Sequence, residues 1–290
     1  MGRTAETLTA AGIEGAGLET GVLIAHVTGL GRMAALSRPE QSIDPAAADE
    51  VAGLARRRSA GEPMAYLTGS REFWSLEFQV SRQTLIPRPD SETLIEAVLA
   101  EVHDLPENPR ILDLGTGSGC LLLALLAELP GATGLGVDIN GEAAALAAEN
   151  AARLGLAGRA RFAVADWTDS LAVGGDKDGY HIVISNPPYV TDAEWAELAP
   201  SVREFEPALA LKGGHDGLGA YRAIAARLIS LLAPGGLAIF EIGAGQADAV
   251  VNILARQGLK TQKPVQDLAG IDRCIIATPK ETWPQGKNKV

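Results

Sequence analysis

Hydrophobic side chains are spaced in two different ways along the chain, and the change falls near residue 70. Residues 1–70 are rich in alanine and repeat apolar side chains at helical spacing, as at Leu18, Val22 and Leu23. Further along, short apolar runs alternate with glycine-rich turns and longer apolar segments. The pattern predicts an N-terminal helical bundle in residues 1–70, followed by an alternating α/β sheet.

A segment of a third kind lies between these two regions. Residues 71–86 place Phe73 and Phe78 among polar neighbours, in a chain that is only 4% aromatic, and this favours a β-hairpin linker. A proline-rich stretch and an amphipathic helix follow, with Asp90 or Ser91 suited to cap the start of that helix.

The remaining apolar runs predict a second domain over residues 87–279, with the polar residues 280–290 as a flexible tail. Each run is short and is separated from the next by a turn or an apolar helix, as expected for strands buried on both faces. The predicted strands are residues 111–114, 135–138, 161–165, 181–185, 237–241 and 273–277, and residues 234–236 are predicted to form a turn.

The fourth of these strands stops abruptly at Asn186-Pro187-Pro188-Tyr189. Proline lacks an N–H and fixes φ, so the segment after Ser185 forms neither helix nor ladder and makes a stiff loop. The loop presents an amide side chain, carbonyl oxygens and an aromatic ring at the carboxyl end of a strand, where open α/β sheets bind ligands. Taken alone, Asn-Pro-Pro is equally compatible with an ordinary turn.

A glycine-rich loop follows the first predicted strand. It reads Gly115-Thr116-Gly117-Ser118-Gly119, directly after Asp113 and Leu114. Asp138 ends the next strand, where a carboxylate can accept hydrogen bonds from both hydroxyls of a ribose. This spacing also suits NAD, but the loop is not G-x-G-x-x-G and Asp113 would repel a pyrophosphate. Both features favour a nucleoside ligand without a phosphate, such as S-adenosylmethionine, whose ammonium group can form an ion pair with a carboxylate.

Asp166 and Trp167 end the third predicted strand, beside the expected adenine. The carboxylate of Asp166 or a backbone N–H can bind the amino edge of adenine, and the indole of Trp167 can stack on its ring. The alternative is that Trp167 only fills the core.

Composition narrows the class of protein. The chain of 290 residues is 47% hydrophobic and can bury a large core, yet it contains no apolar run long enough to span a bilayer. Cys120 and Cys274 are the only cysteines and show no metal-ligand spacing, so we expect a cytoplasmic protein with no metal site. The net charge of −11 disfavours a nucleic-acid partner.

A run of arginines, residues 56–58, is interpreted as a solvated helix end and alternatively as a contact for an acidic partner.

Taken together, the glycine-rich loop, Asp138 and the Asn186–Tyr189 loop resemble the class I S-adenosylmethionine-dependent methyltransferases that act on amino groups. Further segments narrow the resemblance to the PrmC/HemK family, the peptide chain release factor glutamine methyltransferases, over nearly the whole chain. Ser91 departs from the threonine of the family pattern but keeps a hydroxyl. The segments are Ile86–Glu92, Phe205–Pro207, Gly213–Leu218, Glu241–Gly243 with Gln246, and Asp267–Gly270 with Asp272 and Arg273.

The resemblance implies a seven-stranded class I methyltransferase domain and a docking role for the helical bundle. It implies methyl transfer to the glutamine of the Gly-Gly-Gln loop in release factors, with S-adenosylhomocysteine as by-product. Asn186 and the Pro187 carbonyl would hold the glutamine amide, with Pro188 and Tyr189 beside it. The histidines, residues 26, 103, 181 and 215, are scattered, which favours catalysis by positioning. The implied cofactor contacts are Asp113, Gly115, Thr116, Gly117, Ser118, Gly119, Asp138, Asp166, Trp167 and Asn186.

Two other classes of function remain open. A DNA adenine or RNA base methyltransferase would use the same loop to hold an exocyclic amino group, with a flipped base stacked on Tyr189. Residues 1–75 carry 7 basic and 9 acidic side chains, which leaves a charge of −9 on the rest of the chain and disfavours a nucleic-acid clamp. A non-catalytic nucleoside-binding module would leave the Asn186–Tyr189 loop without a role.

Overall fold

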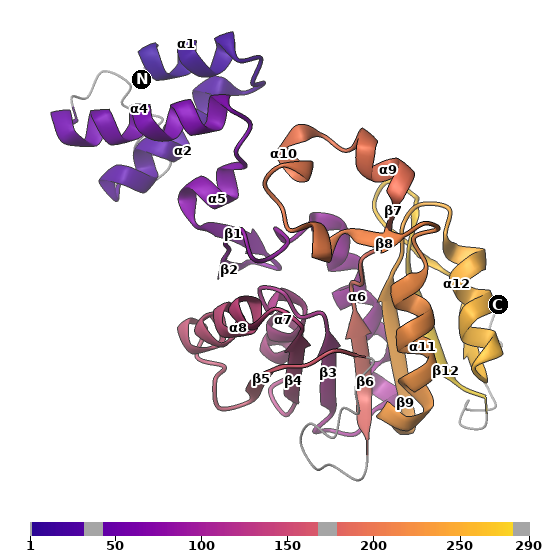
Figure 1. Ribbon diagram of the computed structural model, residues 1–290. Coiled ribbons are helices and arrows are strands. Elements are labelled where there is room, and N and C mark those ends of the chain that lie inside the picture. The colour runs from indigo at the N-terminus through magenta and orange to yellow at the C-terminus, as the bar shows by residue number, and fades with distance from the viewer. Residues whose placement is uncertain (1, 32–42, 168–178, 281–290) are drawn as a thin grey trace. The chain divides into compact units, whose positions relative to one another are not determined.

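A computed structural model describes residues 2–31, 43–167 and 179–280, and Figure 1 shows its helices and strands. The predicted tail, except for its first residue, lies outside these ranges. Contacts between Cα atoms group the chain into two compact units. One consists of Met1–Ser70 with Ala199–Phe205, and the other of Arg71–Leu198 with Glu206–Val290. The short segment 199–205 therefore packs with the N-terminal unit although it is distant in sequence.

The N-terminal unit is helical, as the spacing of its apolar residues predicts. Its core is made by one side of each of three helices, at positions such as Leu8, Leu23 and Val51. Two of the three consecutive arginines bind within this unit, because Arg57 pairs with Glu62 at 2.8 Å and Arg58 pairs with Glu19 at 2.8 Å. The helices are α1 (Gly2–Ala10), α2 (Ala16–Thr28), α4 (Pro45–Ser59), α5 (Met64–Thr68) and α10 (Pro200–Arg203).

The predicted hairpin is present as β1 (Ser70–Phe73) and β2 (Leu76–Gln79). Phe73 and Phe78 are 1% and 0% exposed and pack edge to face inside the larger core of the second unit. The hairpin is therefore an integral part of the second unit and does more than connect two domains.

The second unit is built on a sheet of eight strands, one more than the resemblance implies. The strand order is β10-β12-β9-β6-β3-β4-β5, and the short β11 pairs with β12 beside this path. Strands β5, β4, β3, β6 and β9 are parallel, and β12 is antiparallel to β9. The strands are β3 (Arg110–Leu114), β4 (Thr133–Asp138), β5 (Ala160–Val164), β6 (Tyr180–Ser185), β9 (Leu232–Glu241), β10 (Leu259–Thr261), β11 (Val265–Gln266) and β12 (Asp272–Pro279).

Helices cover both faces of this sheet, as Figure 1 shows. Alternate residues of β3 enter opposite cores, because Ile111 packs with α6 and α7, whereas Leu112 packs with α11 and α12. Strands buried on both faces explain the continuous apolar runs of the sequence. The helices are α6 (Glu92–Glu101), α7 (Cys120–Glu128), α8 (Gly141–Arg153), α11 (Gly219–Leu231) and α12 (Ala247–Arg256).

One predicted boundary is wrong. Residues 234–236 were expected to form a turn before a strand, but they lie inside β9. The register steps from Tyr180 opposite Leu232 to Ile182 opposite Leu237, so the extra residues of β9 are absorbed in a bulge. Backbone pairing with β6 on both sides of the Pro-Gly-Gly segment overrides its turn propensity.

Short elements that precede α6 or follow β6 shape the site at the carboxyl ends of the parallel strands. They include η1 (Pro89–Ser91), β7 (Val190–Thr191), α9 (Asp192–Glu197), η3 (Ala208–Ala210) and β8 (Lys212–Gly214). Within the described ranges, no helix has both the length and the apolar character that a membrane span requires.

Candidate active site

A cavity of about 470 Å³ opens at the carboxyl ends of β3, β4 and β6, within the second unit. This edge is where the strand order reverses direction, the usual ligand site of an open α/β sheet. The volume is within the range of small-molecule sites. The residues predicted from sequence that line it are Gly115, Thr116, Gly117, Ser118, Asp138, Asp166, Trp167, Asn186 and Pro188. Asp113, Gly119, Pro187 and Tyr189 are not among its lining residues.

The glycine-rich loop joins β3 to α7 and requires its glycines. Gly115, Gly117 and Gly119 have φ values of 75°, 55° and 82°, the left-handed region that side chains rarely adopt. A Cβ atom on Gly115 would also lie 3.2 Å from Cζ3 of Trp167. The glycines thus let the backbone approach the indole closely and leave the space above the loop open to a ligand.

Asp138 stands at the end of β4 with its carboxylate held by the backbone. Oδ2 accepts from the N–H of Gly117 at 2.9 Å, and Oδ1 accepts from the N–H of Asn140 at 2.9 Å. Asn140 in turn caps α8 by accepting from the N–H of Glu142. Because each carboxylate oxygen has a second lone pair, Asp138 can still accept from two ligand hydroxyls.

Trp167 and Asp166 line the cavity beside the glycine-rich loop. Trp167 is partly buried and packs against the core on the side of the sheet covered by α11 and α12. One face of the site is therefore an indole next to a carboxylate, which suits a flat, heteroaromatic ring.

Asp113 lies beneath the loop and is 0% exposed. Its Oδ2 accepts from the hydroxyl of Thr116 at 2.7 Å, whereas Oδ1 has no hydrogen-bond partner among the residues that the structure describes. Burial raises the pKa of Asp113 from 3.8 to about 7, and the hydrogen bond from Thr116 opposes that rise. A buried acceptor without a hydrogen-bond partner is unfavourable. A ligand that places a cationic or hydrogen-bond-donating group near this loop would remove that cost.

The raised pKa predicts that Asp113 destabilises the protein increasingly as the pH rises from about 4 to 7, because the folded state then retains a proton that the unfolded state has lost. The substitution Asp113→Asn removes this effect. We expect the free energy of unfolding of the variant, relative to wild type, to increase by about 2 kcal/mol between pH 5 and pH 8. Urea unfolding at both pH values checks this, and a difference that does not change with pH would contradict it.

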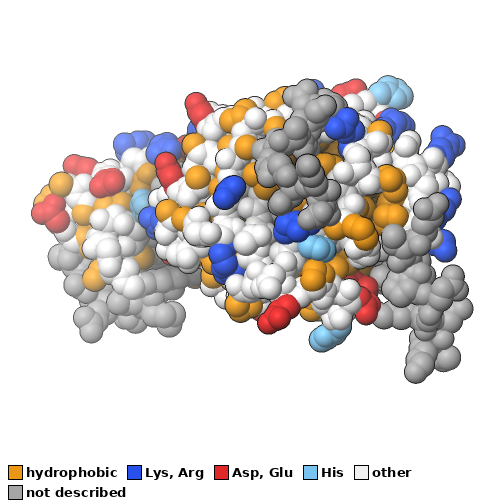
Figure 2. All heavy atoms as spheres, turned by 90° about the horizontal axis from the view of Figure 1, so that it is seen from below, with side chains coloured by type: hydrophobic (Ala, Val, Ile, Leu, Met, Phe, Trp, Pro, Cys, Tyr) orange, Lys and Arg blue, Asp and Glu red, His pale blue; other side chains and the backbone are white. Residues whose placement is uncertain are grey.

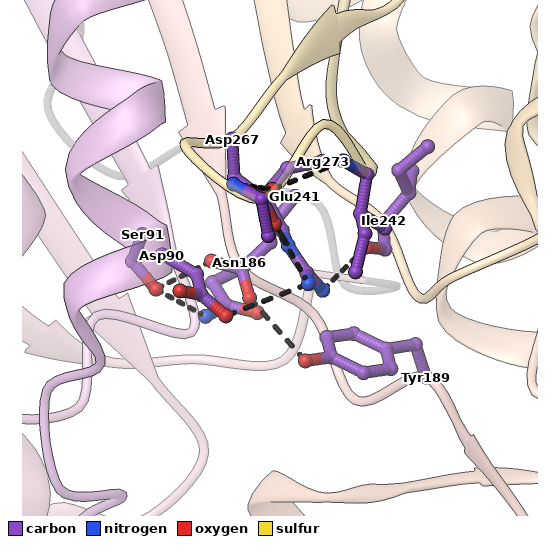
Figure 3. A network of polar contacts seen from close by, with 10 residues as sticks. Asp90, Ser91, Asn186, Tyr189, Glu241, Ile242, Asp267 and Arg273 are labelled. Atoms are coloured by element: carbon purple, nitrogen blue, oxygen red, sulfur yellow. Dashed lines mark hydrogen bonds and ion pairs between the residues drawn. The ribbon is translucent and has the colours of Figure 1, made fainter.

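The Asn186–Tyr189 loop continues β6 into the cavity wall. Asn186 and Pro188 line the cavity, and Pro187 is buried beneath them. The hydroxyl of Tyr189 donates to Oε1 of Glu241 at 3.3 Å, as Figure 3 shows. The placement of Tyr189 beside the substrate stays a prediction, and in the structure its hydroxyl holds the loop to Glu241.

Further contacts anchor the backbone on both sides of this loop. The Tyr189 carbonyl accepts from the Nε2 of Gln246 at 3.0 Å, and Val190 N–H donates to the Leu211 carbonyl at 2.8 Å. A Cβ atom on Gly217 would lie 2.3 Å from the Tyr189 carbonyl oxygen, so only glycine fits there. The site thus has a stiff loop held from three other parts of the chain.

Sequence analysis offered Asp90 or Ser91 as the cap of α6, and Ser91 does occupy the N-cap position, but not as a side-chain cap. Its side chain makes no capping hydrogen bond with α6, and its hydroxyl donates to Oε2 of Glu241 at 2.5 Å. Glu241 itself was noted only as part of a family motif. The signal that could have singled it out is an acidic side chain that ends an otherwise apolar strand, since such a charge is rarely buried without a function.

Arg88 is another cavity residue that sequence analysis did not assign. Its Nη2 pairs with Oε1 of Glu206 at 2.5 Å, and the Glu206 side chain is only 1% exposed. The other oxygen of Glu206 accepts from the N–H of Ile86 at 3.2 Å. Glu206 therefore fixes the proline-rich segment and its arginine at the rim of the cavity.

Comparison with known proteins agrees with this geometry. Residues 2–69 match the family model of the PrmC N-terminal domain, and residues 90–203 match that of the methyltransferase small domain. A release factor glutamine methyltransferase of Rhodospirillum rubrum is 43% identical over 98% of this chain and 85% of its own length. One of Bradyrhizobium diazoefficiens is 41% identical over 94% of this chain and 91% of its own.

A solved structure shares the fold at low identity. The catalytic domain of hMettl16, in complex with MAT2A 3'UTR hairpin 6, superposes with a TM-score of 0.55 at 16% identity, over 80% of this chain and 82% of that one. The second unit has the Rossmann-like fold of class I methyltransferases, as predicted. With relatives of this identity along almost its whole length, the chain belongs to the release factor glutamine methyltransferase family.

Proposed function

We propose that this protein transfers a methyl group from S-adenosylmethionine to the side-chain amide nitrogen of the glutamine in the Gly-Gly-Gln motif of peptide chain release factors. The observation that carries the proposal is the position of Asn186. Its side chain stands at the carboxyl end of β6, in the same cavity as the glycine-rich loop and Asp138. The names of the curated relatives support release factors as the substrate.

The cavity residues fit S-adenosylmethionine. Asp138 offers free lone pairs for ribose hydroxyls, Trp167 offers a flat surface for adenine, and the glycines leave room for the backbone to approach. The unpartnered oxygen of Asp113 lies beneath the loop, where a cationic or hydrogen-bond-donating group of the ligand would supply its missing partner. When bound, this cosubstrate supplies an electrophilic methyl group on a sulfonium.

The protein's own contribution is to orient a weak nucleophile. The lone pair of a glutamine amide is delocalised into its carbonyl, so nitrogen must be held in place before it reacts. Asn186 directs its NH2 to Ser91 and so has its Oδ1 available to accept from the glutamine NH2. An acceptor there holds the nitrogen and stabilises the positive charge that develops on it. A proton is then released to water.

Methyl transfer from isotopically labelled S-adenosylmethionine tests the proposal. We expect label on purified release factor, none on a release factor whose Gly-Gly-Gln glutamine is replaced by alanine, and none on DNA or RNA. Label that persists on the alanine-substituted factor would exclude the glutamine as the acceptor.

The rival function is methylation of an adenine in DNA or of an RNA base, which the same loop could support. On the face shown in Figure 2, lysine and arginine side chains among the coloured residues stand scattered between hydrophobic and uncharged ones and form no continuous basic band. That face is seen from below, away from the carboxyl ends of the parallel strands, so it is the net charge of −11 that favours a protein substrate. We also propose a cytoplasmic location, supported by the free thiols of Cys120 and Cys274.

We further propose that the N-terminal unit docks the release factor. Among its described residues, residues 2–31, 43–70 and 199–205, none lines the cavity. A chain starting at Arg71 keeps the hairpin whose phenylalanines belong to the catalytic core. We expect it to bind S-adenosylmethionine as the full chain does but to methylate intact release factor more slowly, by about tenfold for each 1.4 kcal/mol of docking free energy lost.

The truncation is measured on two substrates, the intact release factor and a short Gly-Gly-Gln peptide. Docking predicts that only the intact factor reacts more slowly, while the peptide reacts equally with both chains. Equal rates on the intact factor, with the truncated chain shown to be folded by its thermal transition, would rule out the docking role.

A further inference from the structure

A chain of hydrogen bonds leads from Asn186 through Ser91, which also lines the cavity, to a buried carboxylate, as Figure 3 shows. The Asn186 Nδ2 donates to Ser91 Oγ at 3.3 Å, and the Ser91 hydroxyl donates to Oε2 of Glu241 at 2.5 Å. Glu241 is 2% exposed and is the last residue of β9. Ser185 and Phe240 are paired in register, so Glu241, the next residue of β9, lies beside Asn186, which directly follows β6.

The direction of these bonds follows from the charge on Glu241. An ionised carboxylate has only acceptors, so the hydroxyl of Ser91 must donate to it. That hydroxyl has a single hydrogen, and it therefore presents only lone pairs to Asn186. The amide of Asn186 must then turn its NH2 toward Ser91, which places its Oδ1 on the opposite side.

We propose that Glu241 and Ser91 are positioning residues that set the orientation of the Asn186 amide, so that its oxygen faces the substrate. This inference rests on the proposed function of Asn186. Neither residue needs to touch the glutamine, because both act through the amide. If Glu241 binds a proton, it can itself donate to Ser91, the hydroxyl hydrogen becomes free to turn, and either orientation of the amide is then satisfied.

The same carboxylate braces the other end of the loop, because its Oε1 accepts from the Tyr189 hydroxyl at 3.3 Å. Arg273 approaches from β12 and pairs with Asp267 at 3.1 Å and with Asp90 at 3.4 Å. The titratable and charged groups that face Glu241 are Asp90 from η1, Tyr189 from the loop, Tyr221 from α11, Arg273 and Cys274 from β12, and Cys120 from α7.

The hydrogen-bond chain from Asn186 through Ser91 to Glu241, here called the relay, depends on pH because the carboxylate of Glu241 titrates near neutral pH. Burial raises the pKa of Glu241 from 4.5 to about 7, against the Ser91 hydrogen bond and the charge of Arg273, which lower it. Glu241 is ionised above this pKa and protonated below it. The oriented state of Asn186 is therefore gained as the pH rises through about 7.

Single-turnover methylation of release factor from pH 6 to pH 9 tests the relay in Ser91→Ala, Ser91→Thr and Tyr221→Phe. We expect the Ala variant to lose about tenfold in rate at pH 8, the scale of one oriented hydrogen bond, with unchanged cofactor affinity and unchanged KM for the release factor. The wild-type rate should rise with pH through about 7, and this rise should be absent in the Ala variant. The Thr variant keeps a hydroxyl and should recover most of the rate.

Tyr221→Phe is the matched control. It removes a buried hydroxyl that donates to the backbone carbonyl of the same Glu241 at 2.8 Å and leaves the carboxylate alone. Its rate and pH profile should equal those of wild type. If Ser91→Ala does not fold, Glu241→Gln provides the same test, since it removes the titrating group and should give a lower rate that does not change with pH.

A second measurement does not depend on turnover. The side-chain NH2 resonances of Asn186, assigned by their loss in Asn186→Ala, should shift with pH near 7 in wild type and not in Ser91→Ala. A Ser91→Ala enzyme with the wild-type rate and pH profile, or Asn186 resonances that do not titrate, would overturn the relay. A wild-type enzyme that methylates no glutamine would refute the proposed function. The pH dependence of the Asn186 resonances would even then show whether Glu241 and Ser91 orient the amide.

Discussion

Replacement of Asn186 by alanine is expected to lower the turnover of methyl transfer by about 10²–10³, the usual cost of losing one preorganised polar contact at a reacting centre. Asn186 lines the cavity, and its Nδ2 already donates to Ser91, so its side-chain oxygen is the atom that can accept from the substrate amide. The alanine variant keeps the stiff loop, because Tyr189 and Val190 are held by other parts of the chain. The loss should therefore appear in the rate and leave cofactor affinity nearly unchanged.

Asn186→Asp separates the two functions of the amide. The substitution keeps an acceptor oxygen for the glutamine but replaces the NH2 that donates to Ser91 with a second acceptor. We expect an activity between those of wild type and Asn186→Ala. Single-turnover methylation at saturating cofactor and release factor measures all three. Near-wild-type turnover in the alanine variant would exclude Asn186 as the group that holds the substrate amide.

Replacement of Asp138 by alanine is expected to weaken S-adenosylmethionine binding by roughly 1.5–3 kcal/mol, which corresponds to about 10- to 150-fold in the dissociation constant. Part of this loss is direct, because hydrogen bonds to a charged acceptor disappear. Another part comes from the glycine-rich loop, since the N–H groups of Gly117 and Asn140 lose the carboxylate to which they now donate.

Asp138→Asn helps to separate these two parts, because it keeps one acceptor oxygen and should weaken binding less than alanine does. Asp248→Ala, at an exposed carboxylate in the first turn of α12, is the control and should bind as wild type does. Titration calorimetry measures all of these affinities. An unchanged affinity in Asp138→Ala would mean that this carboxylate does not bind the ribose.

The strands and helices of the second unit could be predicted because each is a local pattern. An apolar run such as Ile182–Ile184 has no polar face and must be buried on both sides, and the glycines that follow β3 permit a turn that other residues disfavour. The Pro-Gly-Gly segment shows the limit of such reasoning. Its propensity favours a turn, but pairing with β6 keeps it inside β9.

The hairpin shows the same limit at the level of domains. Its aromatic residues mark it as a strand pair in the sequence, yet only the structure places Phe73 and Phe78 in the core beside Leu94. Segment 199–205 could not be assigned to the N-terminal unit from sequence either, because the contacts that place it connect residues more than a hundred positions apart.

By itself, the sequence determined the class of fold, the glycine-rich loop, Asp138 and the Asn186–Tyr189 loop, because each depends on residues that are close together in the chain. Only the tertiary structure decided what surrounds Asn186. Ser91 and Glu241 are 150 positions apart and meet because η1 and the end of β9 are packed against each other. In the sequence, a serine before a helix suggests a side-chain cap. In the structure, the hydroxyl of Ser91 instead donates to the carboxylate of Glu241, because that carboxylate is buried and has no water to bind it.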